Sequence, residues 1–117
     1  MADMKLPKPI ADFFEMKNVH DDEGLWTLFA SDAVIIDGGE NTEIHGADDI
    51  KKWIKKAISG LKLHTEIKNC KEQGGEWIVD TVMTGDFKAS PAQFEYFITL
   101  SGDKISNLRV EFRGSLK

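Results

Sequence analysis

The chain has 117 residues, enough for one domain with a hydrophobic core that needs no metal or disulfide to fold. Its formal net charge of −5 gives it no broad positive field, so we expect neither nucleic acid nor a membrane as its partner. The single cysteine, Cys70, excludes an internal disulfide and a cysteine-based zinc site.

Two helices are predicted at the N-terminal end of the chain. Pro9 can start the first helix, and the spacing of the apolar residues places Phe13 and Phe14 on its inward face. Asn18 ends this helix. A second, short helix is expected over residues 21–29, because acidic residues open it and apolar residues share one face.

The segment that follows predicts two short strands and a third helix. A β-branched run over residues 33–36 indicates a strand that ends at Asp37, directly before two glycines. A brief strand over 42–45 comes next, and apolar residues then repeat with a helical period until Gly60. The other face of this helix carries four lysines, which we interpret as a solvated surface: Lys51, Lys52, Lys55 and Lys56.

From Leu61 onward apolar and polar residues alternate with a period of two. This alternation predicts four strands in a meander, over residues 61–68, 77–84, 94–100 and 105–112. The order ααββαββββ predicts an α+β fold in which an antiparallel sheet carries the helices on one face. We expect a single domain over residues 1–117, with its core in residues 9–112.

Four strings of residues carry a resemblance to a known family: 28–37, 45–50 with Trp53, 85–91 and 94–105. In this order they resemble the SnoaL-like and ketosteroid isomerase-like branch of the nuclear transport factor 2-like superfamily, and the likeness extends from about Pro9 to Phe112. The resemblance implies a cone-shaped, curved antiparallel sheet packed on three N-terminal helices around an apolar small-molecule pocket. Because this superfamily includes isomerases, cyclases, dehydratases, epoxide hydrolases and binding modules, the resemblance does not imply one activity.

The resemblance also suggests catalytic positions. In a gapless alignment with the ketosteroid isomerase pattern, Asp37 falls on the general-base aspartate. Phe13 stands where the isomerase has its oxyanion-hole tyrosine, and Tyr96 stands where it has a protonated aspartate. Both donor positions depart from the pattern, so the resemblance implies an aspartate base without implying steroid isomerisation.

The residues themselves leave two interpretations open for each candidate. Asp37 could be a base whose pKa an aromatic pocket raises, or it could cap the turn before Gly38. Tyr96 could donate to a developing oxyanion, or it could pair with a buried carbonyl or carboxylate. His45 could be a second acid or donor, or it could be a structural residue at a strand end.

The pocket itself is expected to be apolar and largely aromatic. The residues predicted to line it are Phe13, Phe14, Trp26, Trp53, Leu63, Trp77 and Phe94. The remaining histidines, His20 and His64, have no acidic residue at ligand spacing, so we expect no metal and no other cofactor.

Three functions are compatible with this pattern. The first is an enzyme without a cofactor, an isomerase or cyclase in which Asp37 moves a proton next to a carbonyl group and Tyr96 stabilises the enolate oxygen. The second is a non-catalytic module that binds an apolar small molecule, and the third is a dimeric interaction module with a filled pocket. We also expect a cytoplasmic homodimer that pairs through an outer sheet face bearing Ile78, Val82 and Phe97.

Overall fold

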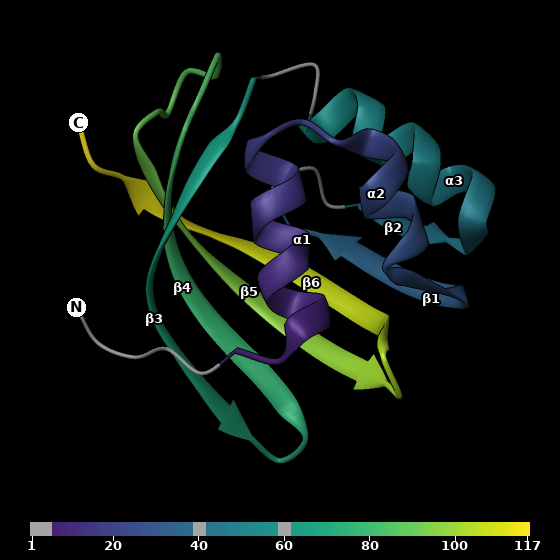
Figure 1. Cartoon of the computed structure of the whole chain (residues 1–117). Helices are drawn as coiled ribbons and strands as arrows, with labels where there is room; N and C mark the ends of the chain where they lie inside the picture. The colour runs from purple at the N-terminus through teal and green to yellow at the C-terminus, as the bar shows by residue number, and fades with distance from the viewer. Residues whose placement is uncertain (1–5, 39–41, 59–61) are drawn as a thin grey trace.

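The computed structural model describes residues 6–38, 42–58 and 62–117. In this part of the chain three helices lie against one face of a curved, six-stranded sheet (Figure 1). The strand order is β2-β1-β6-β5-β4-β3. The α+β fold with the order ααββαββββ is thereby confirmed. The predicted helix end at Gly60 and strand start at Leu61 lie outside the described residues.

The helices are α1 (Lys8–Asn18), α2 (Asp22–Thr27) and α3 (Gly46–Trp53), and a π-helical segment η1 (Ile54–Ile58) continues α3. Helix α1 lies across the concave side of the sheet, whereas α3 lies beside β1 and β2 (Figure 1). Helix α2 ends at Thr27, within the predicted bounds, and Phe29 then opens strand β1 and pairs with Ile105 of β6.

The strands are β1 (Phe29–Asp37), β2 (Thr42–His45), β3 (His64–Gln73), β4 (Glu76–Thr84), β5 (Ala92–Ser101) and β6 (Lys104–Ser115). Within these strands β1 pairs with β6 in parallel, and the other neighbouring pairs are antiparallel. The parallel pair joins the N-terminal hairpin to the C-terminal meander, so α1, α2 and α3 all pack on the same sheet.

Strand β3 continues to Gln73, past its predicted end at Lys68. A bulge between Ile67 and Asn69 interrupts the alternation of inward and outward residues, which is why the period-two pattern stops at that point of the sequence. The hairpin to β4 then turns at Gly74 and Gly75, whose φ angles of 62° and 83° are those that a two-residue turn of this kind requires.

The two faces of the sheet differ in their surroundings. We call the face that packs against the helices the inner face and the opposite face the outer face. Cross-strand register assigns Val79, Tyr96 and Val110 to the inner face, where all three are buried. The outer face carries the neighbouring row Ile78, Phe97 and Arg109. None of the helices in the described ranges has the length and apolar character needed to cross a bilayer.

Candidate functional site

Asp37 lies at the end of β1 and is half-buried. Its Oδ2 accepts a hydrogen bond of 2.9 Å from Nε1 of Trp53, the last residue of α3. The carboxylate is therefore held by an aromatic donor from a helix that packs on the same strand. Sequence reasoning placed Trp53 among the aromatic residues expected around Asp37, but it did not predict the hydrogen bond between them.

Tyr96 shares a row of the inner face with Asp37. Tyr96 pairs with Val110 of β6, and Val110 pairs in turn with Asp37 of β1. Two strand spacings separate Asp37 from Tyr96, about 10 Å between their backbones. The two candidate residues are thus brought to the same side of the sheet, facing the helices.

The ring of Tyr96 is buried among aromatic side chains. It makes edge contacts with Phe13 at 6.1 Å and with Phe14 at 5.0 Å between ring centroids. Burial raises the pKa of Tyr96, and the charge of Asp37 raises it further, whereas a hydrogen bond with Thr65 acts in the opposite direction. The phenol is therefore a neutral hydrogen-bond donor across the physiological pH range.

Lys17 is a functional candidate that the sequence analysis missed. It lies on α1 one turn after Phe13, on the same face as the buried aromatic residues, and only 1% of it is exposed. Its Nζ donates to Oγ1 of Thr65, the residue whose side chain also bonds to Tyr96. Burial lowers the pKa of Lys17 from 10.5 to about 7. A lysine at i+4 from Phe13 was the available sequence signal, because that spacing places it in the apolar stripe of α1.

The neighbouring Asn18 fixes this end of α1 against β3. Its side-chain amide donates to the carbonyl oxygen of Thr65 at 2.8 Å, and its Oδ1 accepts from the backbone N–H of Thr65 at 2.7 Å. These two bonds position Lys17 against the hydroxyl of Thr65. Within the described ranges no carboxylate forms an ion pair with Lys17.

His45 lies apart from this cluster. It pairs with Val34, at the far end of the β1–β2 hairpin from Asp37. Its Nε2 is 2.7 Å from Oε1 of Glu43, and both side chains are exposed. The structure therefore does not bring His45 together with Asp37 and Tyr96.

The predicted lining residues divide into two groups. Phe13, Phe14 and Leu63 are buried in the same core cluster as Tyr96, and Trp77 is half-buried against it. Trp26 and Phe94 are likewise partly buried against this cluster, and Trp26 also lies beneath the charged helix face, with Nζ of Lys51 4.9 Å from its ring centroid. The ring of Phe94 contacts Phe87 and Phe112, at centroid distances of 6.2 and 5.5 Å.

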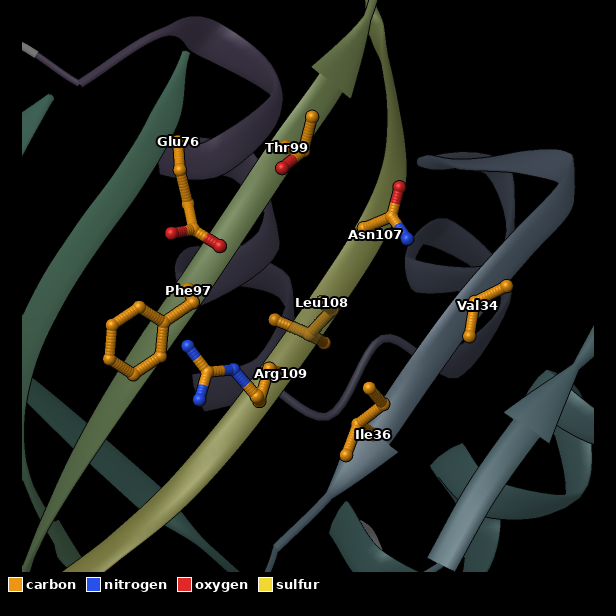
Figure 2. A pocket seen from close by; sticks show the side chains of 8 residues that line it. All are labelled: Val34, Ile36, Glu76, Phe97, Thr99, Asn107, Leu108 and Arg109. Atoms are coloured by element: carbon orange, nitrogen blue, oxygen red, sulfur yellow. The ribbon is translucent and has the colours of Figure 1, made fainter. Parts of the chain in front are cut away.

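The described residues line two hollows at the surface. One, of about 300 Å³, lies between β2 and α3 and is lined in part by Ile44, Lys52 and Trp53. The other, of about 220 Å³, lies on the outer face, where the side chains of Phe97 and Arg109 lie next to one another (Figure 2). Neither hollow is lined by Asp37, Val110 or Tyr96, which form the row on the inner face. Among the described residues, no three His, Cys, Asp or Glu side chains gather as a metal site would require.

The solved structures that are similar to this chain share its fold. A Sinorhizobium meliloti protein named "putative polyketide cyclase" has a TM-score of 0.86 and 25% identity, over 95% of this chain and 100% of that one. A hypothetical protein from Catenulispora acidiphila with a ketosteroid isomerase-like fold, in complex with trimethylamine, has a TM-score of 0.78 and 19% identity, over 96% and 88%. An NTF2-like protein of unknown function from Cytophaga hutchinsonii has a TM-score of 0.74 and 10% identity, over 96% and 95%.

No family model matches the sequence, and no curated protein matches it at a significant level. The resemblance to the nuclear transport factor 2-like superfamily and its SnoaL-like and ketosteroid isomerase-like proteins is nevertheless confirmed by the structural neighbours. What they share with this chain is the fold, and a fold that serves several chemistries does not fix an activity.

Proposed function

We propose that this chain, which has the nuclear transport factor 2-like fold, is a cofactor-independent isomerase or cyclase that moves a proton next to the carbonyl group of an apolar small molecule. The observation that carries the proposal is the row on the inner face, with a carboxylate at one end and a neutral phenol at the other. We also propose that the protein acts in the cytosol.

In this mechanism Asp37 is the base and Tyr96 is the donor. Asp37 accepts the proton from the carbon next to the carbonyl, and the hydroxyl of Tyr96 donates to the oxygen as it becomes an enolate. Two supports come from the structure: Trp53 holds one carboxylate oxygen at 2.9 Å, and the raised pKa of Tyr96 keeps its proton on the phenol. A polyketide cyclase also acts on carbonyl carbon, so the name of the Sinorhizobium meliloti neighbour agrees with this substrate class.

The test is exchange of the α-protons of a small activated ketone, such as 2-tetralone, in deuterated water, followed by proton NMR. We expect the wild type to accelerate exchange and Asp37→Asn to lose about 10²–10⁴ of that acceleration. Trp53→Phe removes the hydrogen bond to Asp37 and part of the indole ring but leaves the carboxylate in place, so it should lose less. Asp32→Asn, on the exposed side of the same strand, is the matched control and should keep full activity.

Two results would overturn the catalytic proposal. One is a wild-type protein that binds the ketone but exchanges its α-protons no faster than buffer alone does. That result would support a non-catalytic binding module. The other is an Asp37→Asn variant, folded by circular dichroism, that retains the wild-type rate.

We also propose that the protein is a homodimer that pairs through the outer face. Ile78, Val82 and Phe97 are each half-buried on that face, and Ile36 beside them is 39% exposed. Apolar side chains gathered on one face of a sheet are typical of a surface that a partner covers. A second copy of the chain would supply the same mixture of apolar and charged side chains.

A further inference from the structure

The feature that the proposed function leaves unused is the buried amine of Lys17. Lysine is almost never fully buried without a carboxylate partner, yet Lys17 is 1% exposed and its hydrogen-bond partner is a hydroxyl, that of Thr65. Thr65 is itself 2% exposed, and its side chain hydrogen-bonds both to the amine and to the phenol of Tyr96. An amine and two hydroxyls therefore form one continuous polar chain inside an apolar core.

We propose that Nζ of Lys17 is a nucleophile that forms an imine with the carbonyl carbon of an apolar ketone or aldehyde. This inference rests on the proposed function only for the class of compound, because imine formation does not require Asp37.

The chemistry needs no co-reactant. The nitrogen lone pair attacks the carbonyl carbon, a C–N bond forms, and the electron pair of the C=O bond moves to oxygen. Both protons of the amine are then transferred to that oxygen, the C–O bond breaks, and water leaves as the C=N bond forms. The hydroxyl of Thr65, in contact with the amine and with Tyr96, can relay these protons from nitrogen to oxygen.

The surroundings of Lys17 favour this reaction over the same reaction at other lysines. An amine attacks only as the free base, and burial lowers the pKa of Lys17 to about 7, so a large part of it is neutral at physiological pH. Lys8, on the same helix, is the opposite case: it is exposed, and its hydrogen bond to Asp12 raises its pKa. An ordinary lysine is about one-thousandth neutral near pH 7.4.

Because Lys17 is buried, a carbonyl compound reaches it only when the helices open locally from the sheet. Small probes should therefore react faster than bulky ones. The contacts that open are those of α1 with β3, which include the paired hydrogen bonds of Asn18 with Thr65.

The experiment uses acetylacetone, a 1,3-diketone that forms a stable, ultraviolet-absorbing adduct with a neutral lysine. Wild type, Lys17→Met and the matched control Lys8→Met are incubated with the probe at pH 7.5, and the modified lysine is located by peptide mass spectrometry. We expect one adduct on Lys17 in the wild type and in Lys8→Met, and at least about a tenfold loss of adduct in Lys17→Met. A second probe, 2-tetralone followed by borohydride reduction, should label the same nitrogen.

Mapping on the wild type keeps the test independent of how the variant folds. Labelling spread over surface lysines, or no labelling of Lys17 while the protein is native, would overturn the proposal and leave Lys17 as a structural core residue. Asp37→Asn separates the two proposals, because it should lose proton exchange and keep the adduct. If the adduct forms and Asp37→Asn keeps the wild-type rate of proton exchange, the imine proposal stands and the proposed function fails.

Discussion

The inner and outer faces of the sheet are built from the same strands, β4, β5 and β6, but the charged side chains on the two faces have different kinds of partner. On the outer face Arg113 lies 2.7 Å from Glu95, and the guanidinium of Arg109 lies 4.0 Å from the ring centroid of Phe97. Against the inner face, Lys17 of α1 has a hydroxyl partner, that of Thr65, and no ion pair among the described residues. Water can compensate an imperfect pair on the outer face, whereas the inner charge must be neutralised by proton loss or by a ligand. An uncompensated polar group in a core is typical of functional sites.

The largest expected effect is on the inner face. Lys17→Met replaces a buried amine with an apolar side chain of similar length, and it should raise the free energy of unfolding by roughly 4 kcal/mol at pH 7. The reason is the lowered pKa of Lys17, because each pKa unit between the folded and unfolded states is worth about 1.4 kcal/mol. Urea denaturation of the two proteins measures this difference.

The pH dependence sharpens the same prediction. The pKa of Lys17 is about 7 in the folded protein, against the ordinary lysine value of 10.5 in the unfolded chain, so between these values the unfolded chain binds more protons. Wild-type stability should therefore rise from pH 7 to 10.5, while Lys17→Met lacks this rise. The gap between the proteins should shrink toward pH 10.5 and stay constant below pH 7. A gap independent of pH would contradict the buried-amine interpretation.

The next largest effect concerns the outer face. Phe97→Glu places a carboxylate in the centre of the proposed dimer interface, and it should weaken association by about 2 kcal/mol, roughly thirtyfold. Sedimentation at several concentrations measures the dimer dissociation constant. Val19→Glu is the control, because Val19 is an exposed apolar residue at the end of α1, away from this face, and is 67% exposed. A wild type that is monomeric at high micromolar concentration would contradict the dimer proposal.

The same contrast explains which features the sequence could reveal. Alternation places Tyr96 on the inner face and Phe97 on the outer face, so the faces and the order of elements were predictable from local pattern. The parallel pairing of β1 with β6 depends on contacts between distant segments, and it is this pairing that aligns Asp37 with Tyr96. Local pattern identified both residues and could not supply the distance between them.

Lys17 and Trp53 show the limit for the candidate site. Lysine is usually an exposed residue, so the residue type gave no reason to expect a buried side chain at this position of the apolar stripe. Only the packing of α1 on β3 shows that the amine meets Thr65. Trp53 was expected to line a pocket, and its hydrogen bond to Asp37 follows from the end of α3 lying beside the end of β1.

The smallest expected effect is at Asp80 on the outer face. Asp80 pairs directly with Glu95 on β5, and its pKa is raised by burial and then by the hydrogen bond and the negative charge of Glu95, although Lys71 and Arg113 act in the opposite direction. A carboxyl whose pKa is raised on folding stabilises the protein below its unfolded value of 3.8, and this contribution is lost as the pH rises through the folded value.

Asp80→Asn keeps the size of the side chain and removes its charge. Because the site is largely solvated and screened, we expect a gain of under about 0.5 kcal/mol at pH 7. Urea midpoints at pH 3.5 and pH 7 test the sign: the gain should be present at pH 7, shrink at pH 3.5 and fall with added salt, since salt screens exposed charges. A loss of stability at pH 7 would mean that Lys71 and Arg113 outweigh Glu95, and that the outer face compensates even this carboxylate.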